Sequence, residues 1–185
     1  PTGVTDPNLT NNTATDTDIR LLEVSIVAHT DVSCWGFSNG SATASAVGGI
    51  TPYTYLWNNG QSLPTATGLT AGTYTVTVTD AQISHAVAQV IITQPSASLT
   101  AGISAQTNVS CFGGTNGSLT VTATGGTPLS LKVFIVLYNY KWSTTPPQTN
   151  PTAVNLGAGT YTVTVTDAHN CTATVTATIT QPTLL

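Results

Sequence analysis

The side chains that could carry out acid–base, nucleophilic or metal chemistry are few in this chain of 185 residues. They comprise one glutamate, six aspartates, three histidines and three cysteines: Glu23, Asp6, Asp16, Asp18, Asp31, Asp80, Asp167, His29, His85, His169, Cys34, Cys111 and Cys171. The sequence indicates no pair of neighbouring carboxylates, no nucleophile motif and no glycine-rich phosphate loop. Asp16 and Asp18 alone fall far short of the six or more oxygens that calcium takes. We therefore predict no catalytic residue, no cofactor and no metal site, and hence a protein that is not an enzyme.

The charge and hydropathy of the chain argue against two classes of partner. Only 5% of the residues are charged, and the net charge at pH 7 is −4. The cations are Arg20, Lys132 and Lys141, which are too few to neutralise a nucleic-acid backbone. The most apolar run, Val133 to Leu137, is far shorter than the roughly 20 residues that cross a bilayer as a helix. We predict neither nucleic-acid binding nor a membrane span.

An internal duplication organises most of the chain. The phrase AGTYTVTVTDA occurs unchanged at 71–81 and again at 158–168. Cys34 and Cys111 are 77 residues apart, whereas Asp80 and Asp167 are 87 residues apart. The second copy therefore contains ten additional residues, most of them within 127–141. A period of this length predicts two structural modules in tandem.

Within each copy, apolar and polar residues alternate with a period of two. Val76 and Val78 are separated by threonines, and Val163 and Val165 repeat the pattern. Such alternation is typical of strands with one buried face. Short runs of this kind lie between clusters of Gly, Pro and Asn, and no helical stripe of useful length is present. This spacing predicts an all-β sandwich or barrel.

Two aromatic positions favour the immunoglobulin-like version of the sandwich. Trp57 and Trp142 each end a short aromatic strand, where the core tryptophan of strand C would lie. Tyr74 and Tyr161 each open a later strand, in the manner of the tyrosine corner of strand F. We predict two tandem immunoglobulin-like β-sandwich modules with these aromatic side chains in their cores.

Polar residues at the strand ends predict turns. Asp80 and Asp167 follow equivalent strands, and a carboxylate at such a place commonly accepts hydrogen bonds from the N–H groups of a turn. The Asn-Gly-Ser sequences that begin at Asn39 and Asn116 predict tight turns into strands. We expect structural roles for all four residues.

These features divide the chain into three parts. Residues 1–20 are polar and aperiodic, and we interpret them as a linker or as an extended arm that adds a strand to a neighbouring subunit. Residues 21–97 are predicted to form the first sandwich repeat. Residues 98–185 are predicted to form the second, which carries the ten-residue insertion. The opening PTGVTDPNLT has no initiator methionine, and we expect a processed or excised piece of a longer protein.

The order of motifs resembles a known family. Each copy has Cys, then NGS, then GG, a short aromatic strand ending in Trp, the phrase AGTYTVTVTDA and a closing ITQP. This pattern, over residues 22–95 and 99–182, is similar to the SprB repeat of giant surface adhesins of gliding Bacteroidota. The resemblance implies export by the type IX pathway, display on the cell surface and a stalk-like or adhesive role. Ser84 stands where the family pattern has a second cysteine, and the insertion is a second departure.

The exported context that the resemblance implies makes disulfides expected. One pairing joins Cys111 to Cys171 within the second copy and leaves Cys34 as a free thiol or as an intermolecular partner. The other joins Cys34 to Cys171 across the junction of the copies and leaves Cys111 for whatever follows. In an immunoglobulin topology the A–B and F–G turns lie at opposite ends of one module but would face each other across a module junction, where the second pairing could form. We take Cys111–Cys171 as the leading expectation and keep the other open.

The duplication, the strands and the resemblance predict a non-catalytic, extracellular structural or adhesive module of a bacterial surface adhesin or filament. Its partners would be neighbouring copies or subunits, with surface glycans as a further candidate. The insertion is the candidate contact surface, as a hairpin or exposed apolar edge, through Leu129, Leu131, Val133, Phe134, Val136 and Tyr138. The alternative is a carbohydrate-binding accessory module of a secreted multidomain protein, with Trp35, Tyr53 or Tyr138 as the stacking platform.

Overall fold

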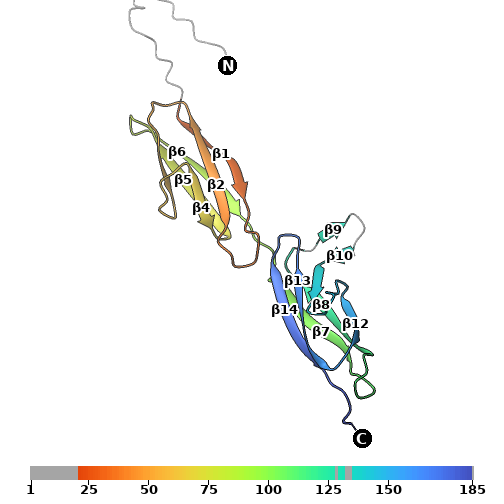
Figure 1. Cartoon of the computed structure of the whole chain (residues 1–185). Helices are drawn as coiled ribbons and strands as arrows, with labels where there is room; N and C mark the ends of the chain where they lie inside the picture. Colours follow the sequence, from red (N-terminus) through yellow and green to blue (C-terminus); the bar gives the residue numbers. More distant parts are fainter. Residues whose placement is uncertain (1–20, 128, 132–134, 185) are drawn as a thin grey trace, which may run out of the picture. The chain divides into compact units, whose positions relative to one another are not determined.

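The computed structural model describes residues 21–127, 129–131 and 135–184, with only the backbone described at 129–131 and 135–137. The predicted arm or linker at 1–20 lies outside the described residues. Every regular element in the described part of the chain is a β-strand (Figure 1). The strands are β1 Glu23–Thr30, β2 Gly40–Val47, β3 Thr54–Trp57, β4 Thr65–Leu69, β5 Gly72–Thr79, β6 His85–Ile92, β7 Thr100–Thr107, β8 Gly117–Thr124, β9 Leu129–Leu131, β10 Ile135–Leu137, β11 Asn139–Trp142, β12 Thr152–Leu156, β13 Gly159–Thr166 and β14 Thr172–Ile179.

The first six strands form two three-stranded sheets. One sheet has the order β1-β2-β4, and the other has the order β3-β5-β6. In the immunoglobulin convention these are strands A, B and E on one sheet and C, F and G on the other, without a strand D. The strand order therefore confirms the predicted immunoglobulin-like sandwich for this half of the chain.

The last eight strands repeat that arrangement and add a hairpin. The sheets β7-β8-β12 and β11-β13-β14 correspond to A-B-E and C-F-G, and β9 pairs with β10 as a separate two-stranded sheet. The pairs β11–β13 and β13–β14 are antiparallel, with Trp142 opposite Val163 and Thr166 opposite Thr172. Each half is thus all-β and immunoglobulin-like, as predicted.

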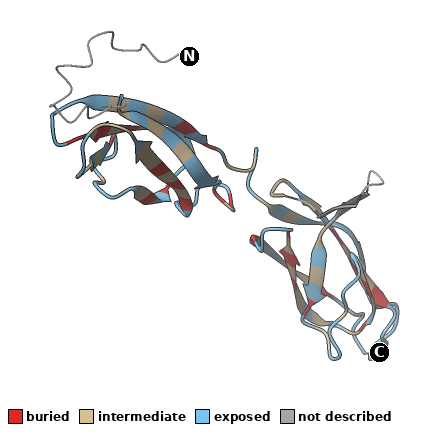
Figure 2. Ribbon diagram, turned by 90° about the horizontal axis from the view of Figure 1, so that it is seen from above, coloured by how far each residue is buried: buried red, intermediate tan, exposed pale blue. Residues whose placement is uncertain are grey.

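The alternation in the repeated phrase places one side of each F strand in a core (Figure 2). Val76 and Val78 of β5 are fully buried, as are Val163 and Val165 of β13. The threonines between them are only half-buried, so their hydroxyls reach solvent while their branched side chains suit the pleat. Burying the valines on one face is what fixes the register of these strands.

The two tryptophans occupy the predicted core positions. Trp57 and Trp142 each have 1% of their surface exposed. Because a buried indole N–H needs an acceptor, each donates to a backbone carbonyl at 2.9 Å, Trp57 to Leu63 and Trp142 to Asn150. The six-residue and eight-residue separations of these pairs show that two of the ten added residues lie in the turn after Trp142.

The tyrosine corner is present in the second half. The Tyr161 hydroxyl donates to the carbonyl of Gly157, four residues upstream, at 3.2 Å. This is the bond that the position of the tyrosine at the start of strand F predicts. It fixes the connection between the E and F strands, here β12 and β13.

The insertion contains the expected hairpin. Its strands β9 and β10 pair antiparallel, with Leu129 opposite Leu137 and Ser130 opposite Val136. The predicted contact residues Val133 and Phe134 lie outside the described residues, and the side chains of Leu129, Leu131 and Val136 are not described. The contact surface stays a prediction.

The chain divides into two compact units. One unit comprises the described part of Pro1–His29 together with Ala42–Ala66 and Thr73–Val90. The other comprises Thr30–Ser41, Thr67–Gly72 and the described part of Ile91–Leu185. The loop after β1, which carries Cys34, therefore belongs to the same compact unit as Cys171.

Candidate functional site: a disulfide between two loops

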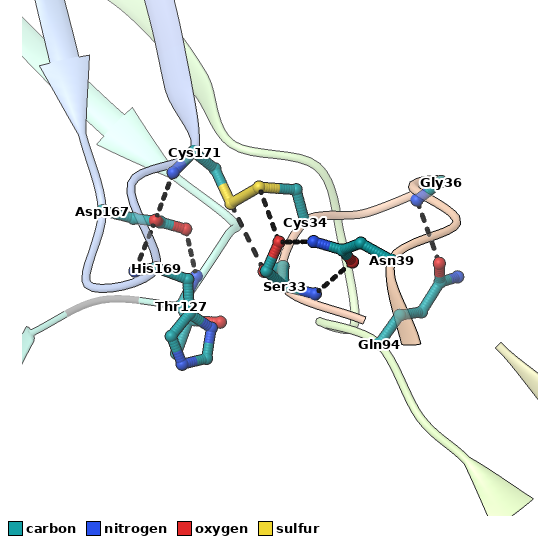
Figure 3. The surroundings of a disulfide bond; sticks show 9 residues. All are labelled: Ser33, Cys34, Gly36, Asn39, Gln94, Thr127, Asp167, His169 and Cys171. Carbon is teal, nitrogen blue, oxygen red and sulfur yellow. Dashed lines mark hydrogen bonds between the residues drawn. A yellow bond between two sulfur atoms is a disulfide. The ribbon is translucent and has the colours of Figure 1, made fainter. Parts of the chain in front are cut away.

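The structure pairs Cys34 with Cys171, 137 residues apart in the sequence (Figure 3). Their Cα atoms are 5.7 Å apart, within the usual range for a disulfide. Cys111 is an exposed free cysteine. The leading expectation, a Cys111–Cys171 bond with Cys34 left over, was therefore wrong, and the pairing kept open beside it is the observed one.

The physical reason lies in the length of strand β14. Val109, two residues before Cys111, donates its N–H to the carbonyl of Thr180 at 3.0 Å, so its loop lies where β14 ends. Cys171 lies directly before Thr172, where β14 begins. Strand β14 has eight residues, and at about 3.4 Å per residue its ends are about 24 Å apart. A disulfide cannot bridge that distance.

The loop that carries Cys34 is closed by side chains of two other residues. Asn39 accepts a hydrogen bond from the Ser33 N–H at 3.1 Å and donates its amide to the Ser33 hydroxyl at 2.7 Å. Gln94, beyond the end of β6, accepts a hydrogen bond from the Gly36 N–H at 2.9 Å. These bonds hold the backbone on both sides of Cys34 and so fix the direction in which its sulfur points.

The turn that carries Cys171 is organised by a buried carboxylate. Asp167 is 2% exposed. Its Oδ1 accepts hydrogen bonds from the N–H groups of His169 and Cys171, both at 2.9 Å, and its Oδ2 accepts one from Thr127 at 2.8 Å. These three backbone donors satisfy the oxygens of the buried carboxyl group. The carboxylate thereby connects the β13–β14 turn to the segment after β8.

The two loops also touch without a hydrogen bond. The carbonyl oxygen of Ser33 lies 3.3 Å from Sγ of Cys171. Because a disulfide sulfur carries no hydrogen, this is a close contact only. The Ser33 hydroxyl lies 3.7 Å from Sγ of Cys34 and is the weak donor to that sulfur.

The first copy has the same carboxylate turn without the cysteine. Asp80 is buried and accepts hydrogen bonds from the N–H groups of Ile50 at 3.0 Å, Gln82 at 2.9 Å and Ser84 at 2.8 Å. The hydrogen bond from Ile50 is the main cause that lowers the pKa of Asp80, and the bonds from Ser84 and Gln82 add to it against the desolvation of the buried group. The predicted turn roles of Asp80 and Asp167 are confirmed.

A glycine packs against each carboxylate. Gly126 has φ +62°, and a Cβ at this position would lie 2.6 Å from Oδ2 of Asp167. Gly49, with φ +58°, stands in the same relation to Oδ2 of Asp80. The second glycine of each Gly-Gly pair is therefore required for two reasons. A side chain there would collide with the carboxylate, and the backbone has a conformation that favours glycine.

The proposed aromatic platform is only partly available for stacking. Trp35 is 48% exposed. Tyr53 and Tyr138 are half-buried and donate their hydroxyls to backbone carbonyls of the Gly-Gly turns, Tyr53 to Gly48 and Tyr138 to Gly125. Burial is the main cause that raises the pKa of Tyr138, and the nearby charge of Asp167 adds to it.

The described part of the chain shows no group of three or more His, Cys, Asp or Glu side chains that could hold a metal ion. Asp16 and Asp18 lie outside the described residues. Among the described residues there is also no helix long and apolar enough to cross a bilayer.

Sequence reasoning missed Asn39 and Gln94 as the residues that fix the cysteine loop. The signal was present, because Ser110, Asn116 and Gln181 occupy the equivalent positions in the second copy. Asn39 was interpreted only as part of a turn, and Gln94 only as part of the closing ITQP. A polar side chain at the same position in both copies indicates a repeated local contact.

The strand order and the disulfide define an all-β chain of immunoglobulin-like sandwiches of the kind found in exported proteins. The sequence model of the SprB repeat matches residues 27–62 and 103–147. We therefore identify two tandem SprB repeats in this chain. The match supports an extracellular structural or adhesin-type module.

Solved structures show weaker likenesses. The chain is 18% identical to the three N-terminal domains of the bacteriophage RB49 highly immunogenic outer capsid protein (Hoc), with a TM-score of 0.47, over 86% of this chain and 59% of that one. It is 14% identical to domains 4 and 5 of the S-layer protein SbsC, with a TM-score of 0.28, over 89% of this chain and 98% of that one. The sequence matches no curated protein. The fold assignment rests on the strand order rather than on these likenesses.

Proposed function

We propose that this chain is a non-catalytic structural module of a bacterial surface adhesin or filament, in which the disulfide transmits tension past the folded repeats. The observation that supports the proposal is the Cys34–Cys171 bond, which closes a loop with a sequence separation of 137 residues. A bond of this span changes how the chain responds to a pulling force.

The path of that force follows from the connectivity. Tension applied at the two ends passes along β1 to Cys34, across the disulfide to Cys171 and along β14. Strands β1 and β14 are already extended, at about 3.3 Å per residue. The tension therefore bypasses the residues between the cysteines, which hold all the other strands.

The size of the effect can be stated from the chain geometry. The bypassed segment spans 137 residues, and at about 3.3–3.6 Å per residue it would add about 450–490 Å of length if it unravelled. The disulfide keeps that length hidden. A surface adhesin under shear would therefore keep its reach even when a single sandwich loses its fold.

Single-molecule pulling on the two ends of the chain tests this proposal. The oxidised chain should extend without the unfolding steps of the bypassed strands, whereas the Cys34→Ser variant should gain about 450–490 Å more. Cys111→Ser is the matched control, because it removes a cysteine without touching the disulfide, and it should behave as the unaltered chain. Equal final extension of the oxidised chain and the Cys34→Ser variant would sink the proposal.

We propose residues 21–97 and 98–185 as the two modules and the insertion as their contact with neighbouring copies. Support comes from the hairpin of β9 and β10, which the first copy lacks. Deleting Leu129–Leu137 should leave the unfolding temperature nearly unchanged and weaken assembly or surface attachment. Unaltered assembly after the deletion would assign the contact to another surface.

A further inference from the structure

We propose that Cys111 is the covalent attachment point for a further repeat of the SprB type. Its partner would be the cysteine in the Asp-x-x-x-Cys turn of that repeat, the turn that here runs from Asp167 to Cys171. The inference rests on the proposed function and deepens it, because it makes the disulfide a device that recurs from repeat to repeat.

The loop that carries Cys111 duplicates the loop that carries Cys34. Asn116 accepts a hydrogen bond from the Ser110 N–H at 3.1 Å and donates to the Ser110 hydroxyl at 2.9 Å. Gln181 accepts a hydrogen bond from the Gly113 N–H at 2.9 Å. Every one of these bonds has its counterpart around Cys34, with distances that agree within 0.2 Å. The second loop is thus built like the first.

An independent observation shows what such a loop binds. The equivalent residue in the first copy, Cys34, forms a disulfide in this structure, and its partner is the turn cysteine of the other copy. The bond is therefore made by the loop of one repeat and the turn of the next. Applied to the second repeat, the same rule gives Cys111 a partner in the turn of a following repeat.

The turn of the first copy has the same backbone structure but lacks the cysteine. Ser84 has the same backbone bonds as Cys171, including its N–H to the Oδ1 of the preceding aspartate, at 2.8 Å for Ser84 and 2.9 Å for Cys171. A serine cannot form a disulfide, so the first repeat offers a loop cysteine but no turn cysteine. Along this chain the bond is made once, and Cys111 is the thiol left to make it again.

The surroundings of Cys111 are open for a partner. The thiol is exposed, and the neighbouring Phe112 is 53% exposed. Phe112 occupies the position of Trp35, the aromatic residue beside the bonded Cys34. An aromatic side chain next to the cysteine in both loops gives the incoming turn an apolar surface to pack against.

The bond requires an oxidant, which we assign to the class of disulfide compounds outside the cytoplasm. The Cys111 thiolate attacks one sulfur of the oxidant and displaces the other as a thiolate. The turn cysteine of the partner, as a thiolate, then attacks the Cys111 sulfur and displaces the second half of the oxidant. Two protein thiols lose two electrons and two protons, and one oxidant disulfide becomes two thiols.

A single substitution tests the rule on the intact chain. Ser84→Cys supplies the missing turn cysteine in the first repeat, so the Cys111 loop of one molecule can bond to the first-repeat turn of the next. In a buffer of reduced and oxidised glutathione, this variant should form a ladder of head-to-tail oligomers on a non-reducing gel. Ser62→Cys, which places a cysteine at another exposed serine of the same repeat, is the matched control and should couple about tenfold more slowly because it lacks the oriented turn.

Peptide mapping decides the outcome. The proposal requires the new bond to join Cys111 to the peptide that carries the Ser84→Cys substitution, and it requires Cys111→Ser to abolish the ladder. Coupling no faster than in Ser62→Cys, or a main product with Cys111 bonded to Cys111, would overturn it.

A second arm covers the case in which Ser84→Cys fails to fold. The unaltered chain is mixed with the Cys34→Ser, Cys111→Ser double variant, in which Cys171 is the one remaining thiol and lies on its native turn. The predicted product is a heterodimer joined through Cys111 and Cys171, and its absence counts against the proposal. If no heterodimer forms but the pulling experiment gives its predicted result, only the attachment through Cys111 is refuted. Equal extension of the oxidised chain and the Cys34→Ser variant would instead refute the proposed function.

Discussion

The carboxylate of Asp167 accepts a hydrogen bond from the backbone N–H of Cys171 at 2.9 Å. The next-to-last residue of the repeated phrase therefore holds the cysteine that forms the disulfide. The same carboxylate accepts a hydrogen bond from the backbone N–H of Thr127, where the insertion begins. The buried side chain of Asp167 thus connects the end of β13, the β13–β14 turn and the cysteine that forms the disulfide.

Replacing Asp167 with alanine should destabilise the second repeat and slow the formation of the disulfide. The substitution leaves three N–H groups without their acceptor, and we expect a loss of about 2–3 kcal/mol in the free energy of unfolding. Urea unfolding and the rate of disulfide recovery after reduction measure the two effects. Asp80→Ala is the matched control, since its turn carries Ser84, and it should leave disulfide recovery unchanged. Equal recovery rates in both variants would contradict the role of Asp167.

Gly126→Ala should be more destabilising than Gly113→Ala. Both glycines have positive φ, +62° and +71°, so both substitutions carry the conformational cost of about 1–2 kcal/mol. At Gly113 nothing lies within 4 Å of the added Cβ, whereas at Gly126 the Asp167 carboxylate is 2.6 Å away. We expect Gly126→Ala to lose about 1 kcal/mol more. Thermal unfolding of the two variants side by side checks the difference, and equal losses would show that the carboxylate can move aside.

Acid should weaken the first repeat through Asp80. Its pKa is held below the ordinary 3.8, first by the hydrogen bond from Ile50. A carboxyl group with a lowered pKa in the folded state contributes its full stabilisation above the unfolded-state pKa, and loses it as the pH falls through the folded-state value. The urea midpoint measured from pH 7 to pH 2 should therefore fall less steeply below pH 4 in Asp80→Asn than in the unaltered chain. Parallel curves would contradict the assignment.

Trp142→Ala should cost about 3–5 kcal/mol, because it removes a fully buried ring and leaves a cavity among the residues of the second core. Trp35→Ala is the control with the same chemistry, and its half-exposed ring should change stability by about 0.5 kcal/mol or less. Chemical denaturation gives both values. A similar loss in both variants would mean that Trp35 is packed more firmly than its exposure indicates.

Much of the fold could be predicted from the sequence because its signals are local. The alternation around Val76 and Val163 reports which face of a strand is buried, and the position of Trp57 and Trp142 reports strand C. Asp80 and Asp167 are recognisable because a carboxylate after a strand has few other roles. Each of these inferences needs only neighbouring residues and the period of the pattern.

The disulfide could not be assigned in the same way. Composition and spacing show that Cys34 and Cys111 are equivalent, but they do not show that Cys171 lies about 24 Å from Cys111 along β14. That distance depends on the strand order, which brings the loop before β8 to the end of β14. The role of Gln94 was missed for the same reason, since Gly36 and Gln94 are 58 residues apart.

Mass spectrometry of the oxidised chain, alkylated before digestion and kept unreduced, tests the central claim most directly. We predict one cross-linked species that joins the peptide of Cys34 to the peptide of Cys171, and full alkylation of Cys111. Recovery of a Cys111–Cys171 species with alkylated Cys34 would contradict the covalent link between the repeats and the proposals that depend on it.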